Sequence, residues 1–514
     1  MGEGALNEKR DGPVSEASQT HLSPQVSALP SALQRAMPDA AGAAEAPLYA
    51  ARKAIYPQAV TGRFRTIKWA VLAITLGLYY FLPFLRWDRG PNAPNQAILI
   101  DLDNGRFYFF FIEIWPQEVY YLTGLLILAA LVLFLMNALA GRVWCGYLCP
   151  QTVWTDLFYA VERLIEGDRR QQMQTAKQAM TLEIFSQKLL KHSIWLLIAW
   201  WTGGAWVLYF ADAPTLVYRL ATFQGPALAY IWIAILTFTT YALAGFMREQ
   251  LCTYMCPWPR IQAALTDEYA LNVTYRYDRG EPRGSIKKNE ALKLDGKPAG
   301  DCVDCHQCVQ VCPTGVDIRL GLQMDCIQCG LCIDACDAIM AKIHKPAGLI
   351  AYDTDMNVQA RMAGRPEVFR PLRPRTLLYA AMIVLVGGIM LVALGARTPF
   401  DLSVMHDRNP LYTRLSDGSL RNGYTLRAAN KTLEVRQFAI SIEGLAESRI
   451  DIIGGTVDPQ GRAILTVGPD QTQEARILVT TKSAKLPAST PLSLVLTDLS
   501  DGKSAWARDS FAAP

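Results

Sequence analysis

Five long apolar segments constrain the fold of this chain more than any other feature. They cover residues 67–85, 119–140, 194–211, 227–246 and 376–394, and Lys68 is the one charged residue within them. Each has about the 17–25 residues that a helix needs to cross the hydrocarbon core of a membrane. Five spanning helices are therefore expected, because buried helices of a soluble protein rarely supply so many uncharged runs of this length.

The composition agrees with a membrane core that has soluble parts attached. Apolar residues make up 51% of the 514 residues and charged residues 19%. These values exclude a chain that is disordered throughout, and 12 cysteines are too few for a disulfide-rich secreted domain. A net charge of +4 is too small to indicate a nucleic-acid partner.

Lysine and arginine residues indicate the orientation of the chain. They gather before the first apolar run, after the second and fourth, and before the fifth, as Arg63, Arg163, Arg248 and Arg373 illustrate. Because positive charge accumulates in cytoplasmic loops, the N-terminus is expected in the cytoplasm. An odd number of spans then places the C-terminus on the outer side.

Eight of the 12 cysteines form two copies of a ferredoxin motif. The spacing C-x2-C-x2-C-x3-C is typical of proteins with two [4Fe–4S] clusters, in which the fourth cysteine of each motif binds the other cluster. The ligands expected for cluster 1 are Cys302, Cys305, Cys308 and Cys336, and those for cluster 2 are Cys326, Cys329, Cys332 and Cys312.

Two other metal sites could use some of these residues. A pair of zinc sites would use the same thiolates, but zinc motifs rarely have three cysteines at two-residue gaps and a fourth three residues further on. Cys302, Cys305 and His306 also match C-x-x-C-H, the signature for covalent haem attachment. Two further cysteines at the ferredoxin spacing argue against haem. We expect His306 to be a surface residue beside a cluster.

The remaining four cysteines form a second repeat, C-x-Y-x-C-P. Cys145 and Cys149 follow the second apolar run, and Cys252 and Cys256 follow the fourth. A gap of four residues predicts that both thiols of a pair lie on one face of a helix, about one turn apart. The proline after each pair discourages continuation of that helix or begins a new one.

Several functions are open to these motif cysteines. Arg142 and Arg248 precede the two pairs, and positive charge favours thiolate. If the two hairpins pack together, the thiolates could hold Cu(I), form a third metal centre or act as a redox dithiol; packing alone is the plain alternative. We treat all four as candidate catalytic residues and candidate copper ligands.

The segment from residue 397 onward has the pattern of a β domain. Short alternating apolar and polar stretches occur at 434–442, 449–453, 463–467, 475–480 and 491–496. They predict an antiparallel β-sandwich of roughly 100 residues. This segment contains no cysteine, so its core must hold without disulfides, and the N-x-T match at Asn430 is treated as chance.

The expected fold is a multidomain membrane protein: an α-helical bundle with an inserted ferredoxin domain and an all-β C-terminal domain. The expected boundaries are a disordered tail at 1–55, a four-span domain at 56–256, a cytoplasmic two-cluster domain at 257–375, a fifth span at 376–395 and the β domain at 397–514.

These motifs resemble those of the cytochrome c oxidase accessory protein CcoG family, also called FixG or RdxA. The resemblance rests on both cysteine repeats, the late fifth span and the segment N-G-Y-T-L-R-A-A-N-K-T at 422–432, and it covers nearly everything after the tail. It implies an immunoglobulin-like C-terminal domain in the periplasm and a bacterial inner-membrane protein. It also implies reduction of Cu(II) to Cu(I) during assembly of cbb3-type oxidase.

The family's cluster ligands and membrane-proximal cysteines correspond to the positions given above. The implied partners are oxidase subunits or copper-delivery proteins and an unidentified cytoplasmic electron donor, and the chain could form a homo-oligomer. Two other functions remain open: a respiratory subunit that relays electrons to or from quinone, and a redox-sensing scaffold for assembly.

Overall fold

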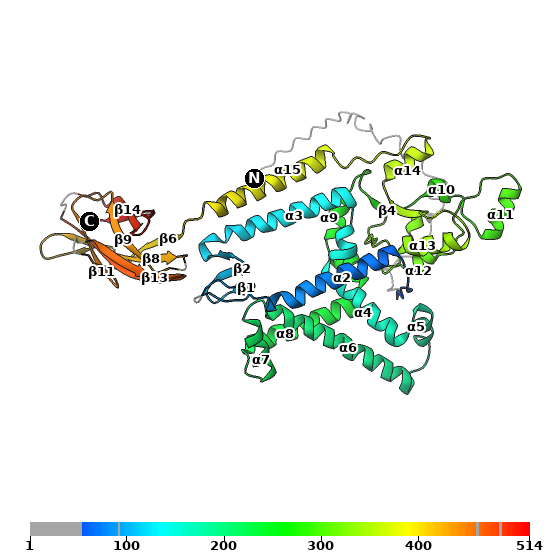
Figure 1. Ribbon diagram of the computed structural model, residues 1–514, viewed down its shortest axis with the longest axis horizontal. Coiled ribbons are helices and arrows are strands. Elements are labelled where there is room, and N and C mark those ends of the chain that lie inside the picture. The colour runs from blue at the N-terminus through cyan, green and yellow to red at the C-terminus, as the bar shows by residue number, and fades with distance from the viewer. Residues whose placement is uncertain (1–53, 91–92, 433, 459–461, 483–485) are drawn as a thin grey trace, which may run out of the picture. The chain divides into compact units, whose positions relative to one another are not determined.

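The computed structural model describes residues 54–90, 93–432, 434–458, 462–482 and 486–514 (Figure 1). The tail expected to be disordered, residues 1–55, lies almost entirely outside the described residues.

The first described part is helical and carries both C-x-Y-x-C-P motifs. Its helices are α2 (Arg63–Phe81), α3 (Tyr120–Ala140), α4 (Pro150–Glu166), α5 (Arg169–Thr175), α6 (Leu182–Val207), α7 (Ala213–Ala221), α8 (Ala227–Thr240) and α9 (Trp258–Leu265). A small antiparallel sheet of β1 (Ile98–Asp101), β2 (Arg106–Phe109) and β3 (Ile112–Ile114) connects α2 to α3.

Four helical segments in the described part of the chain are long and apolar enough to cross a membrane. They are Arg63–Phe84, Tyr120–Ala140, Ala227–Met247 and Pro374–Gly395, and they match the first, second, fourth and fifth apolar runs. The third run falls mostly in the C-terminal half of α6, whose first half carries Glu183, Lys188 and Lys191. The prediction of a membrane bundle is confirmed, with four spans rather than five meeting this criterion.

The apolar side chains of these spans point outward. At most 17% of the most apolar window of any span is buried inside the protein. Val384 and Val392, on α15 (Pro374–Gly395), are both 73% exposed. Such a surface is unfavourable in water and favourable in lipid, so the exposure pattern supports membrane insertion.

The two ferredoxin motifs lie in a compact domain between α9 and α15. Its elements are β4 (Asn272–Tyr275), α10 (Tyr277–Gly280), α11 (Ile286–Leu294), α12 (Gln307–Gln310), α13 (Leu331–Lys342), β5 (Ile350–Asp353) and α14 (Asp355–Met362). Strands β4 and β5 pair antiparallel, and Val273, Met340 and Ile350 pack with six of the eight ferredoxin cysteines in one hydrophobic core.

The C-terminal part is a β-sandwich of two antiparallel sheets. One sheet has the order β10-β13-β8-β6 with β7 paired to β8, and the other has the order β11-β12-β9-β14-β15. The strands are β6 (Phe400–His406), β7 (Thr413–Arg414), β8 (Leu420–Asn430), β9 (Arg436–Glu443), β10 (Ser448–Ile453), β11 (Thr456–Val457), β12 (Ala463–Val467), β13 (Gln471–Thr481), β14 (Ser489–Asp498) and β15 (Ser504–Ala512). All five expected segments fall on strands, so the prediction of a sandwich is confirmed.

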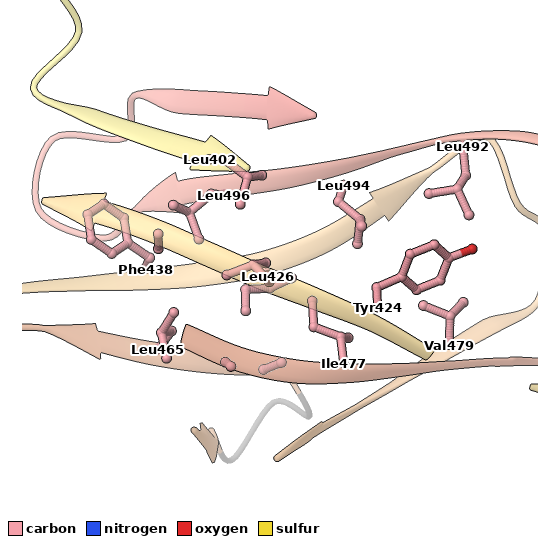
Figure 2. Packing of buried hydrophobic residues seen from close by; sticks show 14 of the residues in the cluster. Leu402, Tyr424, Leu426, Phe438, Leu465, Ile477, Val479, Leu492, Leu494 and Leu496 are labelled. Carbon is pink, nitrogen blue, oxygen red and sulfur yellow. The ribbon is translucent and has the colours of Figure 1, made fainter. Parts of the chain in front are cut away.

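Alternate residues of these strands fill the space between the sheets. Tyr424, Leu426 and Ile477 from one sheet meet Phe438 and Leu494 from the other (Figure 2). All five side chains are completely buried. This aliphatic and aromatic packing holds the domain without a disulfide, since all 12 cysteines are free and none lies in it.

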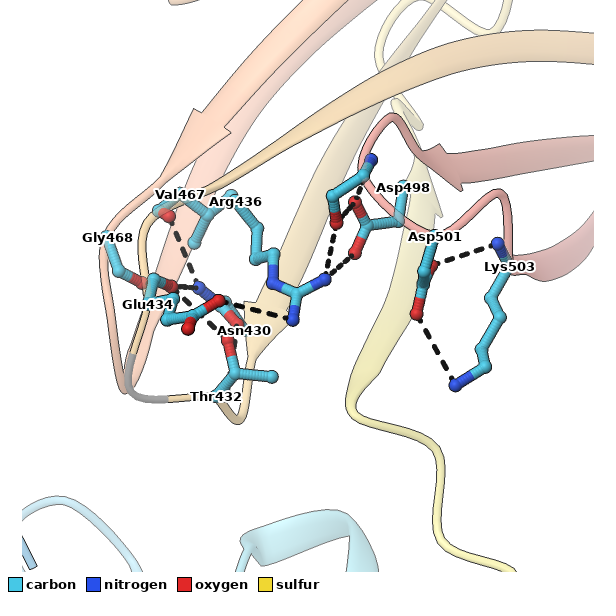
Figure 3. Close-up of polar contacts among 10 residues, drawn as sticks. Asn430, Thr432, Glu434, Arg436, Val467, Gly468, Asp498, Asp501 and Lys503 are labelled. Carbon is cyan, nitrogen blue, oxygen red and sulfur yellow. Dashed lines mark hydrogen bonds and ion pairs between the residues drawn. The ribbon is translucent and has the colours of Figure 1, made fainter.

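Asn430 closes one end of the sandwich. Its side-chain amide donates to the carbonyl oxygens of Glu434, Val467 and Gly468, at 2.7, 3.3 and 2.9 Å (Figure 3). The residue is fully buried. The amide of this N-x-T match is therefore used inside the domain, which is inconsistent with a glycosylation site.

We expect Leu426→Ala to lower the free energy of unfolding of the C-terminal domain by about 2–5 kcal/mol, because the lost side chain leaves a cavity between the sheets. Urea-dependent hydrogen exchange of β8 and β13 in the full-length protein measures this change. Leu411→Ala is the control, since Leu411 is 51% exposed. Equal effects of the two changes would contradict the prediction.

Candidate functional site

The two ferredoxin motifs have matching backbone conformations. In the first motif, Asp304 and His306 have positive φ angles of 55° and 57°; in the second, Gln328 and Gly330 have 55° and 74°. These residues stand two and four positions after the first cysteine of each motif. Left-handed residues within turns direct successive N–H groups toward one point, an arrangement that iron–sulfur sites use to stabilise negative charge.

Each motif contributes cysteines to two separate cavities. The first cavity is lined by Cys302, Cys305, Cys308 and Cys336, and the second by Cys326, Cys329, Cys332, Cys312 and also Cys308. The structure therefore brings the fourth cysteine of each motif to the cavity of the other, which is the grouping expected from the spacing.

The residues around both cavities fit [4Fe–4S] clusters. Apart from the cysteines, the walls are mainly apolar, with Val273, Val316 and Ile318 at the second cavity and Met340 and Leu349 at the first. Sulfur donors in such a setting suit an iron–sulfur cluster.

The geometry does not favour zinc or haem. Within the described ranges, no group of three or more His, Cys, Asp or Glu side chains is placed to hold a single metal ion. A cubane does not need that convergence, because each thiolate binds a different iron atom. His306 is exposed, and its Nδ1 lies 2.7 Å from Nη2 of Arg319.

The two C-x-Y-x-C-P motifs also share one conformation. Cys145 lies in a π-helical turn, Trp144–Leu148, and Cys252 lies in a matching turn, Leu251–Met255. The prediction of an α-helical turn between the paired cysteines is therefore wrong, because a wider π-helical turn is present instead. Isolated π turns of this kind often occur at functional sites.

The second cysteine of each motif leaves its helix with extended backbone. The ψ angles are 127° at Cys149 and 123° at Cys256, because the following proline disfavours a helical conformation. Each N–H still donates to the carbonyl oxygen five residues earlier, of Trp144 or Leu251, at 2.9 and 2.8 Å.

At Cys145 and Cys252, burial opposes formation of the expected thiolate. Burial, reinforced by repulsion from the other motif cysteines, raises the pKa of Cys145 and of Cys252 to about 12. The charge of Arg142 opposes this rise only in part, and Arg248 is paired with Glu162 at 3.0 Å. A metal ion that binds here must displace protons.

The first motif packs directly on the wall of the second cavity. Cys145 lies in a hydrophobic cluster with Ile327, Cys329 and Cys332. The hydroxyl of Tyr147 donates to the carbonyl oxygen of Cys329 at 2.9 Å. One motif cysteine is thus in the same packed cluster as two of the expected cluster 2 ligands.

The second motif faces a polar cavity. Cys252 lines a cavity of about 360 Å³ together with Lys68, Asp156 and Arg248 of the membrane domain and Thr314 of the ferredoxin domain. Thr314 lies 3.4 Å from the sulfur of Cys312. This cavity therefore extends from Cys252 to the loop that carries Cys312, an expected ligand of cluster 2.

Sequence reasoning missed the residues that join the two domains. The sequence predicts that Arg142 favours thiolate at the motif, and its guanidinium donates to the carbonyl oxygens of Met324, Cys326 and Pro259. Its backbone N–H donates to the side chain of Gln328 at 2.7 Å. Gln328, in the loop between Cys326 and Cys329, is only 1% exposed, and burial of this kind depends on tertiary packing.

Three family models match parts of the chain. A 4Fe-4S dicluster domain matches residues 247–355, a 4Fe-4S binding domain matches 122–167, and an immunoglobulin-like fold from the C-terminus of FixG matches 390–514. The first match includes both ferredoxin motifs, and the second includes Cys145 and Cys149.

Three relatives are similar over most of the chain. Protein RdxB of Cereibacter sphaeroides is 51% identical over 435 residues, which cover 84% of this chain and 90% of the relative. Protein RdxA of the same organism is 52% identical and covers 79% of this chain and 86% of its own length. The nitrogen fixation protein FixG of Rhizobium meliloti is 45% identical and covers 84% and 87%.

Apolar spanning helices, 4Fe-4S domains and a C-terminal immunoglobulin-like domain define a membrane-bound iron–sulfur protein of the redox class. The chain belongs to the FixG family, together with RdxA and RdxB. The resemblance stated from the motifs is thereby confirmed.

We expect Gly146→Ala to disturb cluster 2 and leave cluster 1 intact. A methyl group at Gly146 would lie 2.8 Å from the carbonyl oxygen of Ile327 and 3.1 Å from Cα of Cys329, so the loop must move. EPR spectra of the reduced protein measure the effect. Gly77→Ala is the control, because no atom lies within 4 Å of its added methyl group. An unchanged cluster 2 signal in Gly146→Ala would show that the loop position does not matter.

Proposed function

We propose that this chain is a membrane-bound cupric reductase that supplies Cu(I) for assembly of cbb3-type cytochrome c oxidase. The observation that carries the proposal is the packing of Cys145 against the hydrophobic cluster that contains Ile327 and Cys329. Buried contact between a motif thiol and the wall of a cluster cavity offers a short route for an electron.

Two [4Fe–4S] clusters, when bound, would supply the single electrons that this reaction needs. The proposed ligands are Cys302, Cys305, Cys308 and Cys336 for cluster 1, and Cys326, Cys329, Cys332 and Cys312 for cluster 2, as the lining of the two cavities supports. A reduced cytoplasmic electron-carrier protein is the proposed source of electrons.

Cys145, Cys149, Cys252 and Cys256 are the proposed copper-binding residues. One electron converts Cu(II) to Cu(I), and the protons displaced from the thiols pass to water. Thiolates are soft ligands that prefer Cu(I), so the site would stabilise the product. Cu(I) binds few ligands. The two pairs of cysteines therefore do not need to converge on one ion.

The polar cavity beside Cys252 offers a route by which the ion could reach these thiols. The proposed location is the bacterial inner membrane, with the ferredoxin domain in the cytoplasm and the immunoglobulin-like domain in the periplasm. There the latter domain would contact oxidase subunits or copper-delivery proteins.

The copper step predicts that the motif cysteines are required for Cu(I) formation but not for cluster binding. The purified protein is reduced anaerobically and mixed with Cu(II), and cluster oxidation and Cu(I) formation are followed together. We expect stoichiometric Cu(I) from the wild type and none from a variant with all four motif cysteines changed to Ser, although both clusters remain.

Met255→Leu is the control, since this sulfur-bearing side chain lies in the same turn as Cys252 but is 58% exposed. Equal Cu(I) from the Ser variant would place copper elsewhere. No Cu(I) from either protein, with reduced clusters intact, would reject the reductase and favour electron relay to quinone.

The crossed ligand sets predict which cluster each fourth cysteine holds. Cys312→Ser should remove the cluster 2 signal, although Cys312 belongs to the first motif, and Cys336→Ser should remove the cluster 1 signal. EPR and iron analysis of the two variants distinguish the signals. The opposite assignment of losses would show that each motif binds its own cluster.

A further inference from the structure

Helix α2 begins without a capping side chain of its own. Its N-cap residue is Gly62, and its first turn contains no acidic residue. The first N–H groups of a helix have no partner within the helix and carry partial positive charge. A partner must therefore come from elsewhere in the protein.

Asp334 of the ferredoxin domain supplies this partner. Its two carboxylate oxygens accept from the backbone N–H groups of Phe64 and Arg65, at 3.1 and 2.8 Å. These are the groups that an N-cap side chain normally binds. Asp334 is 7% exposed, so the contact is shielded from water.

Gly62 makes this approach possible. A Cβ atom at Gly62 would lie 2.3 Å from Cγ of Asp334. An ordinary capping residue cannot stand at position 62 while the carboxylate of Asp334 is in place. Gly62 and the carboxylate of Asp334 therefore act together to cap α2.

Asp334 stands between ligands of both proposed clusters. It lies in α13 two residues after Cys332, which lines the second cavity, and two residues before Cys336, which lines the first. A shift of this carboxylate relative to α2 would therefore move both cavities relative to the membrane domain.

Arg65 continues the connection toward the motif cysteines. Its backbone is held by Asp334, and its guanidinium donates to both carboxylate oxygens of Asp156 at 2.8 and 2.9 Å. Asp156 is buried in α4, the helix that begins at Pro150 immediately after Cys149. The buried chain of contacts thus runs from the cluster domain through α2 to α4.

We propose that Asp334 is a positioning residue that caps α2 from the ferredoxin domain and thereby holds the clusters in register with the motif cysteines for electron transfer. This inference rests on the proposed function and adds a residue to it. Its role differs from helix capping alone, because a cap on α2 itself would not link the two domains.

The test separates capping from linking with three variants of the full-length protein. Asp334→Ala removes both roles. Gly62→Ser combined with Asp334→Gly lets α2 cap itself, since the Cβ atom of residue 334, which would lie 2.6 Å from the new Cβ, is removed together with the carboxylate. Asp168→Ala is the matched control, because Asp168 accepts from the N–H of Ala59 at 2.9 Å, just before α2, and lies outside the ferredoxin domain.

The first readout is the rate of cluster oxidation by Cu(II) in stopped flow, with cluster content checked by EPR. We expect Asp334→Ala to slow this rate by about tenfold to a hundredfold, as small misplacements of reacting groups do, with both cluster signals retained. The double variant should remain slow, and Asp168→Ala should be close to the wild type.

Recovery of the rate in the double variant would overturn the proposal, since Asp334 would then be a helix cap only. An unchanged rate in Asp334→Ala would overturn it as well. If Asp334→Ala loses its clusters, Asp334→Leu replaces it, because Leu keeps the bulk of the side chain but has no accepting oxygen; a rate equal to the wild type would reject the role.

The second readout does not depend on copper. Hydrogen exchange is measured for residues 62–66 and 150–156. We expect Asp334→Ala to speed exchange in both segments. The double variant with Gly62→Ser should restore slow exchange only in residues 62–66. If the wild type forms no Cu(I), the copper reaction is rejected, but the exchange pattern still decides whether Asp334 links the domains. Restoration of slow exchange in both segments would reject the link.

Discussion

The packing of the first motif turn on the loop that carries Cys326 and Cys329 is the contact on which the rest of the structure depends. Gly146 lets the two backbones approach closely, and Tyr147 binds the carbonyl oxygen of Cys329. Left-handed residues bend this loop around its cavity and leave its carbonyl groups without regular partners. Because buried carbonyls need hydrogen bonds, Arg142 and Tyr147 of the membrane domain complete the cluster loop.

Two internal repeats meet at this contact, and they meet asymmetrically. The ferredoxin motifs and the cysteine–proline motifs each repeat their backbone conformation. Yet only Cys145 packs in the cluster with Cys329 and Cys332, whereas Cys252 lines the polar cavity. Equal motifs therefore occupy unequal surroundings: Cys145 packs beside a cluster cavity, although its thiol also donates to Gln262, and Cys252 lines a cavity with charged side chains.

The features that sequence predicted well are those with a strict local rule. Cysteine spacing placed eight thiols at two cavities, and alternation located strands such as β12, Ala463–Val467. Predictions that depended on the three-dimensional surroundings of a residue were less accurate. The turn at Cys145 is a π turn rather than an α-helical one, and burial raises the pKa of its thiol more than Arg142 lowers it. The run at 194–211 is uncharged, but its helix begins earlier, among Glu183 and Lys188.

By itself, the sequence determined the membrane helices, the two cluster-binding motifs, the second cysteine repeat and the sandwich, because length, spacing and alternation act over a few neighbouring residues. Only the tertiary structure decided which partners lie across the domain boundary. Asp334 caps a helix 270 residues away, and Arg142 binds carbonyl groups more than a hundred residues distant. Such contacts depend on how helices and loops pack. In the sequence, an aspartate or arginine is compatible with a position exposed to water, and only the packed structure places it beside a buried backbone group that needs a hydrogen-bond partner.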